Sequence, residues 1–201
     1  MRLVEHIQNI HKLKANIAKL RQLNSGELAA LKKWYDVTYT YNSNAIEGRS
    51  VQEILEAKNH KDAIDLLYTA VQYKTSLNAE LMQAFHQAMM KDIGACTLPD
   101  MSNIWAAYHE DTDKGDLVAI ARFYYDCAQL EPDIYGGGQV LRLITNAMLL
   151  RCGYPLQILP FERKQEYLSS LHSSKTFSDF YTFFLSVQYE SMKDYLRMLA
   201  T

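Results

Sequence analysis

The stretch Glu131–Gly153, with the sequence EPDIYGGGQVLRLITNAMLLRCG, decides the fold of this chain. Behind three consecutive glycines it is apolar on nearly every side, through Val140, Leu141, Leu143, Ile144, Ala147, Met148, Leu149 and Leu150. A helix that is apolar nearly all round is a buried helix. The stretch therefore predicts a central helix over residues 139–152. Gly153 is expected to cap its C-terminus, and Pro155 prevents the helix from resuming.

Gly136, Gly137 and Gly138 precede this predicted helix and can adopt backbone conformations that are closed to other residues. Such a loop lets N–H groups converge at a helix N-terminus, where anions such as phosphate bind. A flexible loop before a core helix is the simpler interpretation. Arg142 favours the anion site, because the helix dipole disfavours a cation in the first turn unless a phosphate or carboxylate balances it. These four residues are the candidate anion- or nucleotide-binding residues.

The same stretch resembles the signature of Fic (Fido-fold) proteins, H-P-F-x-[DE]-G-N-G-R-x-x-R, whose members typically transfer AMP from ATP to a protein hydroxyl. Here it reads E-P-D-I-Y-G-G-G-Q-V-L-R, in which four positions match: Pro132, Gly136, Gly138 and Arg142. The resemblance places Glu131 at the catalytic histidine and Tyr135 at the metal-binding acid. It also places Gly137 at the asparagine and Gln139 at the first arginine. The resemblance covers nearly the whole chain and implies a degenerate family member that lacks the catalytic histidine.

A second motif lies about a hundred residues earlier, in the string YNSNAIEG over residues 41–48. It is similar to the inhibitory motif of Fic proteins, [ST]-x-x-x-E-[GN], through Ser43, Glu47 and Gly48. The resemblance implies that Glu47 pairs with the last arginine of the signature and blocks seating of the ATP γ-phosphate. Because a buried guanidinium cannot shed its proton and requires an anion, we expect Glu47 and Arg142 to form an ion pair.

Periodic apolar residues predict helices along the rest of the chain. The expected ranges are 2–22, 26–42, 51–72 (opened by a capping box at residues 50–53), 77–91, a short helix over 101–109, 116–130, 139–152, 161–171 and 177–200. A turn is expected over residues 111–115, and His60 and His86 are expected to be packing residues. The sequence thus predicts an all-α, single-domain Fic/Fido helical fold of about eight helices around the buried central helix. Residues 1–48 are its N-terminal helices, which end in the inhibitory-type motif, and residues 49–201 its degenerate core. Residues 92–100 are too few for the flap hairpin of the family, which is expected to be missing.

Net charge, cysteine count and the length of apolar runs argue against several classes of protein. The net charge of −2 gives no support for nucleic-acid binding. Cys96, Cys127 and Cys152 are odd in number and unclustered, which indicates reduced thiols in a cytoplasmic protein. The charged N-terminus is not a signal peptide, and no apolar run reaches the roughly 20 residues of a membrane span.

The departures at Glu131, Tyr135 and Gln139 predict that the chain is inactive in AMP transfer, with no catalytic residues, no metal site and no cofactor. It would then be a regulatory, anion- or nucleotide-binding or protein-interaction module, or a decayed Fic protein. Its partner is unspecified, and an active Fic protein and a second copy are both open. The alternative is an active adenylyltransferase that uses ATP and Mg²⁺, with Glu131 as the base in place of histidine.

Overall fold

The computed structural model describes residues 3–20, 23–48, 54–93, 98–130, 136–171 and 175–200. Within these ranges the chain forms helices and no strands. The helices are α1 (Leu3–Ile17), α2 (Ser25–Ile46), α3 (Ile54–Gln72), α4 (Ala79–Met90), α5 (Ser102–Asp113), α6 (Leu117–Leu130), α7 (Gly137–Arg151), a 3₁₀ turn η1 (Phe161–Arg163), α8 (Lys164–Leu171) and α9 (Phe177–Ala200). The expected all-α fold is confirmed.

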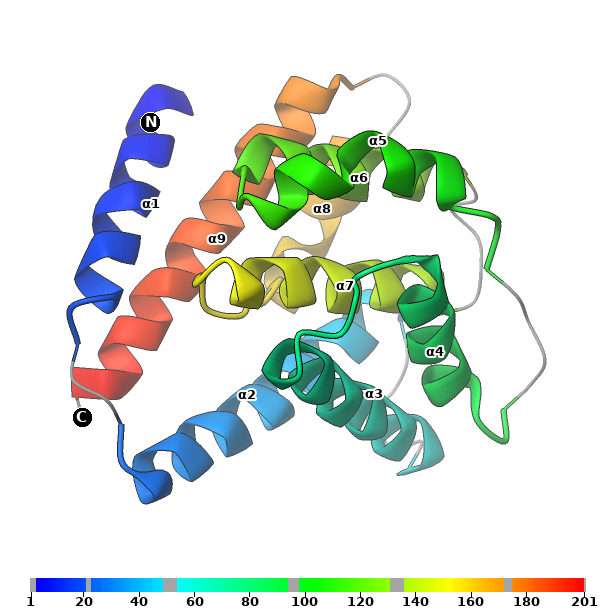
Figure 1. Ribbon diagram of the computed structural model, residues 1–201, viewed down its shortest axis with the longest axis horizontal. Coiled ribbons are helices and arrows are strands. Elements are labelled where there is room, and N and C mark those ends of the chain that lie inside the picture. The colour runs from blue at the N-terminus through cyan, green and yellow to red at the C-terminus, as the bar shows by residue number, and fades with distance from the viewer. Residues whose placement is uncertain are drawn as a thin grey trace.

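Helix α7 lies at the centre of the molecule, with α5 and α6 on one side and α3 and α4 on the other (Figure 1). Its side chains are buried from Gln139 to Leu149, and Leu143, Ile144 and Leu149 are fully inaccessible to solvent. Burying each of these side chains stabilises the fold by roughly 1.5–3 kcal/mol. The prediction of a buried central helix is therefore confirmed.

The ends of α7 are set by two glycines. Gly153 adopts a left-handed conformation with φ of +78°, and the N–H of Tyr154 bonds to the carbonyl of Leu149 at 2.9 Å, so the expected C-terminal cap is present. At the other end the N-cap is Gly136, also with φ of +78°. The helix thus starts two residues earlier than predicted, and Gly137 and Gly138 belong to its first turn rather than to a loop.

Helices α1 and α2 also differ in length from their predicted ranges. Helix α1 ends at Ile17, before the predicted residue 22, and it packs along α9, where His6 stacks on Tyr189 with ring centroids 6.1 Å apart. Helix α2 begins at a capping box formed by Asn24 and Glu27. It continues to Ile46 rather than 42, so most of the 41–48 string is helical and Glu47 is the C-terminal cap residue.

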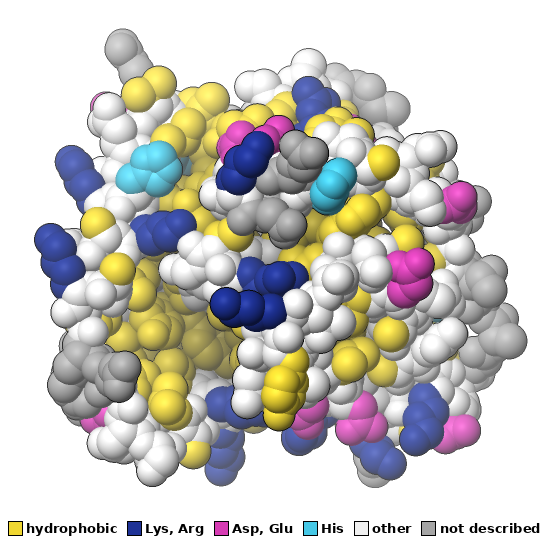
Figure 2. All heavy atoms as spheres, viewed as in Figure 1, with side chains coloured by type: hydrophobic (Ala, Val, Ile, Leu, Met, Phe, Trp, Pro, Cys, Tyr) yellow, Lys and Arg dark blue, Asp and Glu magenta, His cyan; other side chains and the backbone are white. Residues whose placement is uncertain are grey.

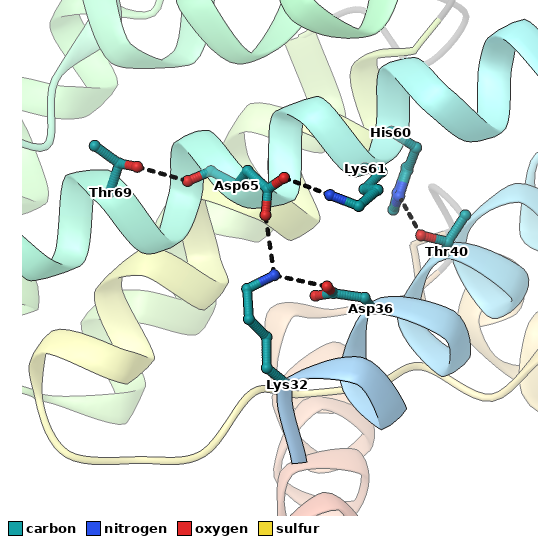
Figure 3. Close-up of polar contacts among 7 residues, drawn as sticks. All are labelled: Lys32, Asp36, Thr40, His60, Lys61, Asp65 and Thr69. Carbon is teal, nitrogen blue, oxygen red and sulfur yellow. Dashed lines mark hydrogen bonds and ion pairs between the residues drawn. The ribbon is translucent and has the colours of Figure 1, made fainter. Parts of the chain in front are cut away.

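Polar contacts fix α2 against α3, as Figure 3 shows. The Lys32 ammonium lies between two carboxylates, 2.6 Å from Asp36 Oδ2 and 2.9 Å from Asp65 Oδ1. One turn further along α2, Thr40 Oγ1 lies 3.0 Å from Nδ1 of the buried His60. Ion pairs at such partly exposed positions contribute at most about 1 kcal/mol each to stability. Lys32–Asp65 and Thr40–His60 connect α2 to α3.

Two other predicted ranges are corrected. Helix α5 runs on to Asp113, into the expected turn, and Thr112 Oγ1 donates to the carbonyl of His109 at 2.9 Å. The range 161–171 divides into η1 and α8. The capping box at residues 50–53 and residues 94–97 of the short 92–100 segment lie outside the described residues. No helix in the described part of the chain has the length and apolar character of a membrane span.

Candidate functional site

The candidate site lies where the C-terminal turn of α2 meets the first two turns of α7. Arg142 Nη2 is 2.8 Å from Glu47 Oε1 and 3.2 Å from the carbonyl oxygen of Ser43, while Arg142 Nε donates to Ser43 Oγ at 3.1 Å. The Arg142 side chain is 6% exposed and that of Glu47 is 24% exposed. The predicted ion pair is therefore present, and it is largely buried.

Gly138 is explained by this ion pair. A Cβ atom on Gly138 would lie 2.8 Å from Glu47 Oε1 and 3.3 Å from Arg142 Nη1, which is too close for an unshifted structure. The missing side chain thus lets the Glu47 carboxylate stand against the first turn of α7. Negative charge is stabilised at that place, because the helix dipole is positive there.

The expectation that the helix dipole makes Arg142 require an anion needs correction. Since α7 begins at Gly137, Arg142 lies in the second turn, where the dipole has faded. Its need for an anion comes from burial, which removes the guanidinium from water. Burial lowers the pKa of Arg142, but the nearby Glu47 carboxylate and the Tyr124, Tyr167 and Tyr39 hydroxyls outweigh it and hold this pKa above its ordinary value.

Two further side-chain contacts join α2 to the core, and sequence reasoning missed both. Gln139 Nε2 donates to Asn44 Oδ1 at 2.7 Å, with both side chains buried. Asn42 Oδ1 accepts from the backbone N–H of Phe161 at 2.7 Å. The only signal for them was the polar run Asn42–Asn44 at the end of an otherwise periodic helix. Three successive residues of α2, together with Glu47, are thus bonded to the rest of the fold.

A pocket of about 380 Å³ opens beside the ion pair. Glu47, Gln129, Gly137 and Gly138 line it, and its walls are mainly apolar, including Met82, Leu141 and Leu168. The thiol of Cys127 also lines the pocket, but burial raises the pKa of this thiol to about 12, so it is not a thiolate nucleophile at neutral pH.

A buried tyrosine pair lies behind Arg142. The Tyr124 and Tyr167 hydroxyls are 2.8 Å apart, and burial raises the pKa of both. Arg142 Nη1 is buried without a hydrogen bond of good geometry. The guanidinium therefore keeps one donor group that is not committed to α2.

The other candidate residues have different places. Gly136 caps α7, and Gly48, with φ of +77°, directly follows the α2 cap residue. Glu131 and Tyr135 lie outside the described residues. His86 is fully buried, as expected of a packing residue, and its ring lies 3.7 Å from where a Cβ on Gly136 would stand.

Comparisons with known proteins show what this sequence and fold are similar to. No protein-family model matches the chain. Two curated proteins, each named protein adenylyltransferase fic-1, from Caenorhabditis briggsae and Caenorhabditis elegans, are 39% identical to it over 60 residues. That segment is 30% of this chain and only 11% of each relative's length.

Solved structures extend the likeness to nearly the whole chain. Fic-1 of Caenorhabditis elegans superposes with a TM-score of 0.78 at 20% identity, over 98% of this chain and 72% of that one. A Fic domain containing signaling protein from Bacteroides thetaiotaomicron gives a TM-score of 0.76 at 19% identity, over 92% of this chain and 94% of that one. The chain therefore has the fold of Fic proteins, and over the matched 60 residues its sequence is similar to that of the two fic-1 proteins.

Proposed function

We propose that this Fic-fold protein does not transfer AMP, and that α2 keeps the N-terminus of α7 closed, so that the protein acts as a regulatory or binding module. The observation that carries this proposal is the Glu47–Arg142 ion pair. In the proposal, Ser43, Glu47 and Gly48 form an inhibitory element. Arg142 pairs with Glu47 instead of with a nucleotide phosphate.

The signature residues support the loss of chemistry. AMP transfer by Fic proteins, as the resemblance implies, requires a histidine base and a carboxylate that holds Mg²⁺ beside the phosphates. The sequence has Glu131 and Tyr135 at these positions. A tyrosine hydroxyl is neutral at physiological pH, because its ordinary pKa is about 10. It therefore cannot replace a carboxylate as a magnesium ligand.

Gln139 adds a separate argument. The family motif has an arginine at this position, whereas Gln139 carries no charge. Its amide is directed toward α2, where it donates to Asn44. One phosphate partner is therefore absent, and the side chain that replaces it strengthens the contact between α7 and α2.

Residual anion binding remains part of the proposal. The first turn of α7 carries the backbone N–H groups of Gly137 and Gly138, and Arg142 Nη1 lies beside them. The Glu47 carboxylate competes for the same position, because any incoming anion would meet its negative charge. We therefore expect phosphate and nucleotides to bind weakly, and Mg²⁺ to add little.

The alternative function is an active adenylyltransferase, which is the activity in the names of the curated relatives. Glu131 would then act as the base, and ATP and Mg²⁺ would bind in the pocket beside Glu47. This alternative requires a raised pKa of Glu131 and a metal ligand other than Tyr135.

Calorimetric titration with ATP, ADP and inorganic phosphate, each with and without Mg²⁺, tests the proposal. We expect weak binding that is similar for the three anions and unchanged by Mg²⁺. The Glu47→Gln variant removes the competing charge and should bind phosphate more tightly, whereas Glu190→Gln, a remote surface control, should not. Tight, magnesium-dependent ATP binding by the unaltered protein would contradict the proposal and favour the alternative.

A further inference from the structure

A second hollow lies on the side of the molecule away from the candidate site. Its volume is about 500 Å³, and its walls come from α2, α3, α9, the end of α7 and the segment after α7. Figure 2 shows it as a recess with an apolar floor, over the region where Figure 1 places α2, α9 and the end of α7. We call it the α2–α9 groove. Its apolar lining includes Leu28, Leu31, Tyr35, Tyr68, Val71 and Leu156.

The residues of α2 that line the groove follow a helical spacing of three and four, from Leu28 through Leu31 to Tyr35. This face is distinct from the end of α2 that contacts α7. Leu28 stands at the rim with 53% of its surface exposed. Leaving a large apolar side chain exposed beside an apolar recess costs free energy that a partner would recover on binding.

The charge at one end of the groove is unbalanced. A neighbouring hollow shares Val71 and Leu150 with the groove, and Lys74 and Arg151 also line it. Arg151 Nη1 donates to the carbonyl of Thr75 at 2.9 Å, and neither cation forms an ion pair with any residue that the structure describes. By contrast, Lys32 in the groove wall is neutralised by Asp36 and Asp65.

We propose that the α2–α9 groove binds an amphipathic helix of a partner protein. The apolar face of that helix covers Leu28, Leu31 and Tyr35, and its acidic side chains meet Lys74 and Arg151. The charge selects an acidic partner, because two unpaired cations repel a basic one. The apolar floor favours a helix whose apolar side chains recur every three or four residues, as in other helices that bind in grooves.

The shape of the groove favours a helix over an extended peptide. Most of its walls are helices whose backbone groups are bonded internally, and the carbonyl of Pro155 in the segment after α7 accepts from Gln188 Nε2, so the described walls offer no sheet edge to a strand. An extended peptide would bury unpaired N–H and C=O groups against the apolar floor, at a cost of about 1–3 kcal/mol for each. A helix satisfies its own backbone and presents only side chains.

A library of displayed helical peptides of about 16 residues, or ~24 Å of helix, tests this proposal. Peptides that bind the intact protein are kept, and those that also bind the Leu28→Glu variant are discarded. This variant removes the apolar side chain at the exposed rim of the groove. Affinities of the selected peptides are then measured by fluorescence anisotropy on the intact protein, on Leu28→Glu and on Lys74→Glu. Val37→Glu and Lys33→Glu serve as matched controls, because both residues are exposed on α2 and line neither hollow.

We expect selected peptides with apolar residues at helical spacing and an excess of acidic residues. Their affinity should fall at least about tenfold on Leu28→Glu and on Lys74→Glu, and stay within about twofold on the two control variants. Selected peptides without acidic enrichment, or no peptides that discriminate against Leu28→Glu, would overturn the proposal.

Two further results would also overturn it, because they assign the groove to another occupant. One is concentration-dependent dimerisation that Leu28→Glu abolishes, which means that a second copy covers the groove. The other is Leu28- and Lys74-dependent binding to phosphatidylcholine–phosphatidylserine vesicles together with failure of the peptide selection.

Discussion

Removal of the Glu47 carboxylate should destabilise the fold, because it leaves a buried guanidinium with too few acceptors. In the Glu47→Leu variant, Arg142 keeps its two bonds to Ser43 but loses its counter-charge. Breaking a fully buried pair costs about 3–5 kcal/mol, and losing a charged hydrogen bond costs about 1.5–3 kcal/mol. Since a quarter of Glu47 is exposed and Ser43 remains, we expect a loss of roughly 1–4 kcal/mol in the free energy of unfolding. For a chain of this size, 2 kcal/mol corresponds to a fall in Tm of about 4–8 °C.

The assay is urea unfolding followed by circular dichroism, on Glu47→Leu, Arg142→Leu and the double variant. The double variant should lose less than the sum of the single losses, with a coupling of about 1–3 kcal/mol. Glu190→Leu is the control, because Glu190 pairs with Lys193 at the surface, and its loss should cost no more than about 1 kcal/mol. A coupling near zero would refute the reasoning, since it would mean that the two side chains act independently.

Three other changes test the same region. Gly138→Ala should lower the free energy of unfolding by about 1–3 kcal/mol through the clash with Glu47 Oε1, and Glu47→Ala in the same chain should relieve most of that loss; full additivity in urea melts would argue against the clash. Gln139→Leu should cost about 1–2 kcal/mol because Asn44 loses its donor, and an unchanged urea midpoint would contradict this. Burial raises the pKa of Tyr39 to about 12 from an ordinary value of 10.0, so its contribution to stability is constant below pH 10 and is lost as pH rises toward 12. Urea melts of the intact protein and Tyr39→Phe between these pH values measure it, and an equal alkaline loss in both proteins would assign that loss to other groups.

The fold could be predicted because its decisive signal is local. The apolar residues of 139–152 admit only a buried helix, and the shorter helices show ordinary amphipathic spacing. The end of α2 was misjudged because Asn42, Ser43 and Asn44 have the composition of a helix end. In the folded protein these polar groups bond to Phe161, Arg142 and Gln139, and the contacts between distant segments let the helix continue.

The site could be predicted only in part, for a similar reason. The pairing of Glu47 with Arg142 followed from the likeness to Fic motifs and from the cost of a buried unpaired guanidinium. The amide contact between Gln139 and Asn44 has no signature in spacing, since it joins residues 95 apart in sequence. Gly138 was expected to serve an anion loop, whereas it lies in the first helical turn and makes room for the Glu47 carboxylate.

Transfer of labelled AMP from ATP by the Glu47→Gly variant tests the central claim most directly. The variant removes the carboxylate that occupies the N-terminus of α7, so any catalytic capacity of Glu131 and the remaining signature would be released. The assay includes Mg²⁺ and a cell lysate as targets, with an active Fic adenylyltransferase run in parallel as a positive control. Our account predicts no labelling of the variant itself or of lysate proteins. Labelling above that of a Glu47→Gly/Glu131→Ala double variant would contradict it and identify Glu131 as a working base.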